Sequence, residues 1–517
     1  MKSWFDGLGH SYRTPIRIRI FGVIPAKPFI LTKIIATLGP ASCEIPVLTR
    51  LIESGVRVFR LNFSHGDPES HLQLLTAARQ ASEEVGIPVG VLGDLCGPKI
   101  RVGKVVEGGV ELQMGQPVYF QRDPILTGED PDAPVTFNVT YDRLIDEVEP
   151  GQRLMINDGN IHVLVMDKTE DKLIGTVTTP GTVTSAKGVN LPETALTVPS
   201  VTAYDWKCAD WAMEHGVDFL ALSFVRKAED VIKLRQYMKR KLKGRLPLPI
   251  IAKIEKPQAI DDLENIVDAS DSIMVARGDL GVEMDLASVP IIQKKIINMA
   301  HDYGKPVIVA TQMLESMIEF PTPTRAEASD VANAIFDGTD CVMLSGETAV
   351  GKHATKAVDH MSRIALKVQE HIVGEKVRWG KPPAKLQADR SRMAALAHGV
   401  MTIVRDMNVK HIVVWSQNGG AARHLSKNRP TLPILAFSSD HQSLRRMTPL
   451  FGVKPMYMEQ PADTEDFIWQ VDQLMQESKM CKVGEALLVV AGEPIGKPGS
   501  TSNIHIHYVG DYFGESG

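Results

Sequence analysis

The segments Ile250-Ile-Ala-Lys-Ile-Glu255 and Ser272-Ile-Met-Val-Ala-Arg-Gly-Asp279 each combine a short apolar run with charged residues at its end. Each run has the length of a buried strand, and a helical pattern follows it, which is typical of βαβ units. The pattern recurs on both sides, from about residue 32 to residue 367. The candidate strands are Lys33–Thr37, Arg57–Asn62, Val89–Asp94, Asp218–Ser223, Ile250–Ile254, Ser272–Ala276, Pro306–Ala310 and Asp340–Leu344. Eight parallel strands with intervening helices predict an α/β fold of the (β/α)8 TIM-barrel type.

The series is interrupted once, between the third and fourth strands. Residues 98–199 are rich in glycine and proline and contain alternating patterns such as Leu173–Thr179. This composition predicts an inserted all-β lid domain. The barrel would then comprise residues 31–97 and 200–372.

Residues 373–517 predict a separate C-terminal α/β domain. They contain a linker at Lys381–Lys385 and a helical pattern at Ser391–Val404. The expected strands are His411–Trp415, Pro433–Phe437, Lys454–Tyr457 and Ala486–Ala491.

Composition limits the partners that the chain can have. Its 517 residues predict about three domains, and 57 basic against 62 acidic side chains leave a formal charge of -5. This balance gives no bulk attraction to nucleic acid or anionic lipid, and no apolar run is long enough for a membrane span. The five cysteines lie far apart without ligand spacing, which predicts reduced thiols and a cytoplasmic location.

The first 30 residues carry more basic than acidic side chains, as transit peptides do. Three prolines, Pro15, Pro25 and Pro28, interrupt any amphipathic helix there. We expect a disordered or mis-started extension, and a targeting signal is the alternative.

Polar residues stand at the ends of most of the barrel strands, where TIM-barrel enzymes place their chemistry. Glu255 and Asp279 end neighbouring strands, so they can meet and bind Mg²⁺ or Mn²⁺. The alternative is a pair of helix N-caps. Arg60, Lys253 and Arg101 add positive charge, which suits a phosphoryl group. These residues predict metal-assisted phosphoryl or enolate chemistry.

On these strand ends and the segments around them, the chain resembles the pyruvate kinase family. The resemblance covers the barrel from end to end in the family's order. The segments that carry it are Thr32–Ser42, Arg60–Gly66, Gly97–Arg101, Lys187–Pro192, Leu222–Lys227, Ile251–Glu255, Ile273–Glu283, Pro323–Glu327 and Met343–Thr348.

The resemblance implies phosphoryl transfer from phosphoenolpyruvate to ADP, which gives ATP and an enolate that is protonated to pyruvate. It implies that Glu255 and Asp279 hold the divalent metal and that Arg60 and Lys253 contact the transferring phosphate. Backbone N–H groups at Gly278 and Asp279 would bind the substrate carboxylate, and Thr311 would lie near the face where the enolate accepts its proton.

The resemblance also implies a nucleotide side, made by Asn62, His65, Arg101 and Lys187. The inserted domain would close over the site and exclude water. The family further implies a homotetramer with Arg325 in the interface between barrels.

One segment departs from the family pattern for monovalent cations. Many members bind K⁺ through an Asn, a Ser, an Asp and a Thr, with a Glu nearby. Here Asn62, Ser64 and Asp94 match, but Leu95 replaces the Thr and Lys99 replaces the Glu. We expect a K⁺-independent enzyme in which the Lys99 ammonium supplies the missing charge. The alternative is that Leu95 is a core residue and Lys99 a solvated hinge residue.

The C-terminal domain contains a candidate effector loop, formed by Ser416, Gln417, Asn418 and Gly419 before a helix that starts near Ala421. Hydroxyl, amide and backbone N–H groups at a helix N-terminus favour a phosphate. Residues 496–503 could close over it. In the family this region binds sugar phosphates, but Asn418 and Gly420 depart from the usual Thr/Ser-rich loop. A plain strand-to-helix turn is the alternative.

Two other functions remain possible from the sequence. A metal-dependent aldolase barrel would handle the same pyruvate enolate, but it would not need a lid with nucleotide contacts. A non-catalytic metabolite sensor would have lost residues of the barrel site, yet Arg60, Lys253, Glu255, Asp279 and Thr311 are all present.

Overall fold

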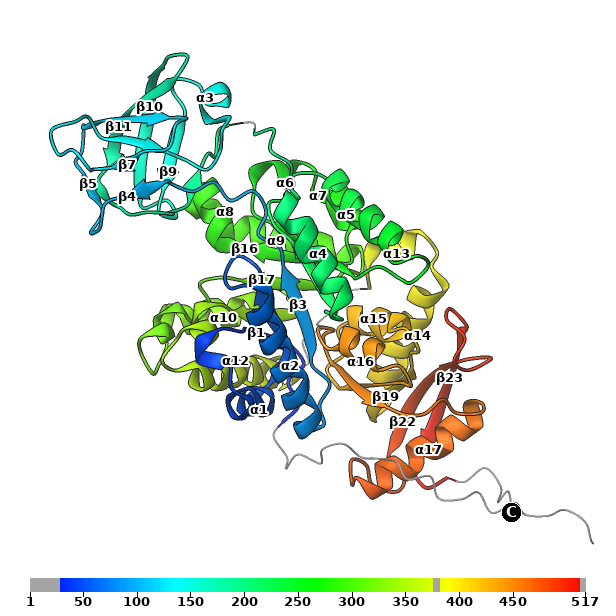
Figure 1. Cartoon of the computed structure of the whole chain (residues 1–517). Helices are drawn as coiled ribbons and strands as arrows, with labels where there is room; N and C mark the ends of the chain where they lie inside the picture. The colour runs from blue at the N-terminus through cyan, green and yellow to red at the C-terminus, as the bar shows by residue number, and fades with distance from the viewer. Residues whose placement is uncertain (1–27, 195, 375–381, 512–517) are drawn as a thin grey trace, which may run out of the picture.

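The computed structural model describes residues 28–194, 196–374 and 382–511. The expected N-terminal extension lies outside these residues except for residues 28–30, as does Lys381 at the start of the expected linker. Figure 1 shows the barrel in the middle of the molecule, the inserted β domain at one end and the C-terminal domain at the other.

Eight parallel strands close into a barrel in the order β1-β18-β17-β16-β15-β14-β3-β2. Their bounds are β1 Lys33–Thr37, β2 Val56–Asn62, β3 Gly90–Asp94, β14 Phe219–Leu222, β15 Ile250–Ile254, β16 Ser272–Ala276, β17 Val307–Ala310 and β18 Cys341–Leu344. The TIM-barrel prediction is confirmed, and each expected strand agrees with the structure to within one residue at either end.

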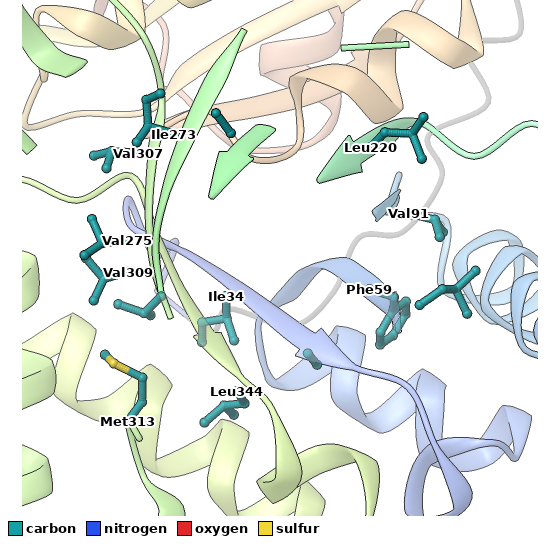
Figure 2. Packing of buried hydrophobic residues seen from close by; sticks show 14 of the residues in the cluster. Ile34, Phe59, Val91, Leu220, Ile273, Val275, Val307, Val309, Met313 and Leu344 are labelled. Atoms are coloured by element: carbon teal, nitrogen blue, oxygen red, sulfur yellow. The ribbon is translucent and has the colours of Figure 1, made fainter. Parts of the chain in front are cut away.

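The apolar residues of the strands divide between two cores because successive side chains point to opposite faces. One set packs outward against the helices, and Figure 2 shows Ile34, Phe59, Val91 and Leu220 among its members. The other set, which includes Ile35 and Val58, fills the barrel interior. The surrounding helices are α1 Ile45–Ser54, α2 Pro68–Val85, α4 Ala203–Glu214, α5 Ala228–Lys241, α7 Leu263–Ala269, α9 Val289–Asp302, α10 Arg325–Phe336 and α12 Ala354–Gly374.

The inserted domain lies between β3 and α4 and has its own core around Phe120 and Phe137. Its main sheet has the order β13-β9-β10-β11-β6-β8. The strands are β4 Lys104–Val105, β5 Val110–Leu112, β6 Pro117–Gln121, β7 Leu126–Thr127, β8 Thr136–Asn138, β9 Arg153–Ile156, β10 Ile161–Lys168, β11 Lys172–Thr179, β12 Gly181–Val183 and β13 Val189–Asn190. A single short helix, α3 Leu144–Glu147, is present among its described residues.

The C-terminal domain is a five-stranded sheet in the order β21-β20-β19-β22-β23. Its strands are β19 Val409–Trp415, β20 Ile434–Ser438, β21 Val453–Tyr457, β22 Ala486–Gly492 and β23 Thr501–Tyr508, and its helices include α14 Arg392–Asp406, α15 Gly420–Lys427, α16 His441–Met447 and α17 Thr464–Glu477. The segment 496–503, which we expected could close over the effector loop, includes the start of antiparallel β23 at Thr501. As an edge strand with one solvated face, β23 alternates polar and apolar residues from Asn503 on and lacks the continuous apolar run of its neighbour β22.

The C-terminal domain docks on the amino ends of the barrel strands. Arg445 Nε lies 2.9 Å from Asp218 Oδ1, and Lys427 Nζ lies 2.6 Å from Asp340 Oδ2. The carboxyl ends of the strands therefore face the inserted domain. Among the described residues, no helix combines the length and apolar character that a membrane span requires.

Candidate active site

Lys253 projects from β15 into a cluster of charged and polar groups. Its Nζ lies 2.9 Å from Glu255 Oε1, 3.3 Å from Asp94 Oδ1 and 2.7 Å from Ser223 Oγ. Burial lowers the pKa of Lys253, but the carboxylates of Asp94 and Glu255 outweigh it and raise the pKa above its usual value. The structure therefore places a permanent, partly accessible positive charge at the mouth of the barrel.

Glu255 and Asp279 lie close enough for the charge of one to act on the other. Glu255 is buried, and its Oε2 accepts a hydrogen bond of 2.7 Å from the Phe224 N–H. Burial raises the pKa of Glu255; Lys253 opposes this, and the negative charge of Asp279 adds to it. Asp279 lies in the first turn of α8 Arg277–Glu283, so the two carboxylates come from neighbouring strand ends.

This donor set fits a hard divalent cation. Glu255 Oε1 is a buried oxygen that accepts no well-aligned hydrogen bond, although it is ion-paired with Lys253. Within the described part of the chain, no three histidine, cysteine, aspartate or glutamate side chains gather as a metal cluster. Two carboxylates that leave other positions to water and substrate oxygens are typical of Mg²⁺ sites.

Asp94 links the two basic residues of the site. It accepts a hydrogen bond of 2.7 Å from Arg60 Nε, and it pairs with Lys253 on its other side. Burial raises the pKa of Asp94, but Lys253 and Arg60 outweigh it and lower the pKa below its usual value. Sequence reasoning assigned Asp94 to a monovalent-cation region, and it missed this bridging position because only barrel closure brings β2, β3 and β15 to one point.

Thr311 lies directly after β17 in an unusual backbone conformation. Its φ is 70° and that of Gln312 is 51°, a strained left-handed pair of the kind often found at functional sites. Thr311 Oγ1 accepts a 2.7 Å hydrogen bond from the Gly278 N–H and lies 2.6 Å from Ala310 O. A substrate carboxylate at the Gly278 N–H would therefore share or displace the Thr311 hydroxyl.

The residues expected on the nucleotide side lie where the barrel meets the inserted domain. Burial lowers the pKa of His65, and the positive charges of Arg101, Arg60 and Lys99 lower it further. Arg101 donates a 3.0 Å hydrogen bond to Ala186 O, next to Lys187. The Asn62 side chain accepts a 3.2 Å hydrogen bond from the Ser64 N–H. His65 therefore lies within the electrostatic reach of three basic side chains.

The two departures from the family's cation pattern have different environments. Leu95 is 1% exposed and belongs to the barrel core. Lys99 is partly exposed, its Nζ lies 3.9 Å from Asp158 Oδ1, and its charge acts on His65. The core alternative for Leu95 therefore holds, and it leaves no side-chain oxygen at that position.

The expected effector loop borders a cavity of about 180 Å³ in the C-terminal domain. Ser416, Gln417 and Asn418 line one side, and residues 496–501 line the other. Ser416 Oγ accepts a 3.2 Å hydrogen bond from the Ala422 N–H. Gly419 does not line the cavity, but its φ of 78° sets the turn into α15, which begins at Gly420.

Sequence reasoning also missed a buried contact between the inserted domain and the barrel. Glu283 Oε1 lies 2.5 Å from Lys256 Nζ and accepts a 2.7 Å hydrogen bond from the Asn190 side chain. In the sequence, Lys256 and Glu283 look like ordinary charged residues beside helix ends. No motif or regular spacing indicates that they contact Asn190.

Comparison with known proteins gives a consistent result over most of the chain. A sequence model of the pyruvate kinase barrel domain matches residues 30–358, and one of the pyruvate kinase alpha/beta domain matches residues 394–507. Over 480 residues the chain is 41% identical to a pyruvate kinase of Mycobacterium tuberculosis and 38% identical to one of Corynebacterium glutamicum, covering 93% of this chain and 98% of each relative. A crystal structure of a pyruvate kinase from Cryptosporidium parvum matches with a TM-score of 0.82 at 33% identity, covering 93% of this chain and 96% of that one.

Proposed function

The chain belongs to the pyruvate kinase family, and from that premise we propose that Lys253 is the centre of phosphoryl transfer from phosphoenolpyruvate to ADP. The observation that carries the proposal is the Lys253 ammonium, fixed between Asp94 and Glu255. A preorganised charge of this kind stabilises the negative charge on the transferring phosphoryl oxygens. Arg60, oriented by Asp94, is placed to bind the same group.

The remaining barrel residues orient the substrate and the proton. The first turn of α8 offers the Asp279 N–H to the substrate carboxylate, and the Gly278 N–H joins it by sharing or giving up its hydrogen bond to Thr311 Oγ1. Thr311 touches Gly278, so it lies beside the position at which the enolate carbon accepts a proton. The side chains of Asn62, His65, Arg101 and Lys187 bind the nucleotide beneath the lid, which excludes water from the transfer.

The family uses a divalent metal, and Glu255 and Asp279 are the residues that hold it in this proposal. Mg²⁺, or Mn²⁺ in its place, supplies positive charge that neutralises phosphate oxygens. The raised pKa of Glu255, caused by burial and by Asp279, supports a cation between the two carboxylates.

A coupled assay tests this function. The protein with Mg²⁺, phosphoenolpyruvate and ADP should form ATP and pyruvate in equal amounts, each followed by its own coupling enzyme. An aldolase would consume pyruvate with an aldehyde and form no ATP. A sensor without activity would form neither product, and either result would refute the proposal.

We also propose that the enzyme does not need K⁺. Leu95 has no oxygen to offer, while the charge of Lys99 reaches His65 in the segment that contains Asn62 and Ser64. A fixed ammonium beside the phosphates would replace the ion.

The test of K⁺ independence compares activity in tetramethylammonium buffer with activity after KCl is added at matched ionic strength. Equal rates are expected. The Leu95→Thr, Lys99→Glu double variant should acquire a K⁺ requirement, since the two changes act on one site. Activation of the wild type by roughly tenfold or more, about 1.4 kcal/mol, would refute the proposal.

A sugar phosphate is the proposed allosteric effector, bound at Ser416, Gln417, Asn418 and Gly419. The cavity between this loop and residues 496–501, with Lys497 on its wall, supports an anionic ligand. A sugar mono- or bisphosphate that activates the wild type should fail on Ser416→Glu, because the carboxylate repels phosphate. Equal activation of both proteins would place the effector elsewhere.

We further propose that the protein is a cytoplasmic homotetramer. Each chain would comprise a barrel domain (31–97 and 200–372), a lid domain (98–199) and a C-terminal domain (373–517). All five cysteines are free, as is usual for cytosolic proteins. Two separate surfaces carry exposed apolar side chains. One has Leu286 just before α9 and Ile291 in its first turn, in the barrel that also carries Arg325, and the other has Ile506 and Tyr508 on the edge strand β23. Two self-complementary surfaces suffice for a dimer of dimers, which light scattering would measure.

A further inference from the structure

A buried polar contact attaches the inserted domain to the barrel. Asn190 of β13 donates its 2.7 Å hydrogen bond to Glu283, the last residue of α8. Glu283 also pairs with Lys256 at 2.5 Å, and all three residues are at least nine-tenths buried. We call Asn190, Glu283 and Lys256 the latch.

The latch joins two elements that carry functional groups. Asn190 lies three residues after Lys187 on the same segment of the lid, and α8 carries Asp279 in its first turn. A second contact lies beside it, because the lid turn at Gly159 packs so closely on Val282 that an added Cβ would lie 3.3 Å from that side chain. The lid therefore docks on the C-terminal half of α8 at two points.

We propose that Glu283 is a positioning residue that holds the lid on α8 through Asn190 and so sets the position of Lys187 beside the nucleotide. The inference rests on the proposed nucleotide role of Lys187 and adds a residue that contacts neither substrate. The Asn190 amide and the Lys256 ammonium both contact Glu283 Oε1, so this one carboxylate oxygen joins the lid to the barrel.

The chemistry of the latch allows the lid to leave and return. When Asn190 withdraws, Glu283 keeps Lys256 as its partner, so no buried carboxylate is left unpaired. Arg226 makes a different kind of contact, since it donates to the backbone carbonyls of Leu196 and Val198 in the return segment of the lid. Arg226 thus holds the return segment through backbone carbonyls, and in the proposal Asn190 is the contact that opens.

Asn190→Ala tests the latch because it leaves the Lys256–Glu283 ion pair intact. We expect kcat/KM for ADP to fall about tenfold, the effect of losing one hydrogen bond to a charged group, while Mn²⁺ binding to the ligand-free enzyme is unchanged. The matched control is Glu193→Gln, which breaks an exposed ion pair with Arg153 inside the lid and should leave both values unchanged.

Lid position is measured separately by spin labels on cysteines introduced at exposed Met166 of the lid and exposed Leu246 of the barrel. The background carries Cys43→Ser and Cys96→Ser, because these two cysteines are exposed or half-buried. The distance distribution should broaden in Asn190→Ala and stay narrow in Glu193→Gln. An unchanged distribution in Asn190→Ala would overturn the latch. If Lys187→Met leaves KM for ADP unchanged while Asn190→Ala broadens the distribution, the latch stands and the role of Lys187 fails.

A swap of donor and acceptor separates positioning from simple loss of structure. Asn190→Asp alone places two carboxylates around one ammonium and should weaken ADP use at least as much as Asn190→Ala. In the double variant with Glu283→Gln, the carboxylate is at position 190 and the amide at position 283. The carboxylate can again accept hydrogen bonds from the amide and from Lys256. Recovery of kcat/KM for ADP to within about threefold of wild type supports the proposal, and a double variant as poor as the single one overturns it.

Discussion

At the amino ends of the barrel strands, Asp218 accepts hydrogen bonds from the Val91 N–H, from Arg79 and from Arg445. At the carboxyl ends, Glu255 has one backbone donor and shares a single ammonium with Asp94. Both ends of the barrel bury charged side chains, but the hydrogen-bond and ion-pair partners of these side chains differ. Asp218 is satisfied by groups of the barrel and of the docked C-terminal domain, whereas Glu255 has a raised pKa, due to burial and the nearby Asp279.

This difference indicates that the buried charges at the two ends of the barrel have different roles. Charges at the amino ends join two domains, and Asp340 with Lys427 repeats the pattern of Asp218. At the carboxyl ends, Asp94 and Glu255 share Lys253, and Asp279 adds a further negative charge beside Glu255. The same substitution at the two ends, lysine to methionine, should therefore give opposite results.

Lys253→Met should have the largest effect on activity. It removes the preorganised charge and keeps the bulk of the side chain, so kcat should fall at least about 10²-fold, as for loss of one electrostatic group in an active site. Circular dichroism should change little. Near-normal turnover in the coupled assay would exclude Lys253 from the transfer.

Asp279→Asn should raise the Mg²⁺ concentration needed for half-maximal activity by at least about tenfold, because it removes one anionic ligand. The control is Asp285→Asn at an exposed position just after α8, which should leave the metal requirement as it is. An unchanged requirement in Asp279→Asn would mean that the metal ligands lie elsewhere.

The sequence predicted the barrel well because each strand is a short buried apolar run, and a helix follows every strand except β3, which leads into the inserted domain. The sequence also predicted that Lys253, Glu255 and Asp279 lie near one another, because the carboxyl ends of neighbouring parallel strands lie at the same edge of the barrel. The bridging role of Asp94 was not predicted, because it depends on contacts among strands far apart in the chain. The hydrogen bond from Gly278 to Thr311 was also hidden, since a β-branched residue rarely adopts a positive φ.

Lys427→Met is the counterpart of Lys253→Met at the other end of the barrel. It leaves Asp340 with the Val307 N–H and with Arg429 at 3.9 Å, so the unfolding free energy should fall by about 2 kcal/mol, with kcat near the wild-type value. Thermal denaturation and the coupled assay measure the two quantities. Lys410→Met, at an exposed pair with Glu485, is the control and should change little. A large loss of kcat in Lys427→Met would contradict the comparison.

The smallest expected effect comes from His301 of α9, beside the same domain contact. Burial lowers the pKa of His301 to about 4, and the positive charges of Lys427 and Arg429 outweigh the opposing effect of Asp340. The folded state thus keeps His301 neutral, while the unfolded chain takes up a proton as the pH falls below about 6.5. Stability from this group is therefore complete above about pH 6.5 and decreases toward pH 4.

Between pH 7 and pH 5.5 this linkage should cost the wild type about 1 kcal/mol of unfolding free energy that His301→Gln does not lose. The measurement is the melting temperature of both proteins at the two pH values. The same replacement at exposed His398 of α14 is the control and should keep the wild-type dependence. If His301→Gln loses as much stability between pH 7 and pH 5.5 as the wild type, the loss of stability in acid does not arise from His301. The contact between the barrel and the C-terminal domain would then depend on Asp218 and Asp340 and not on a neutral histidine.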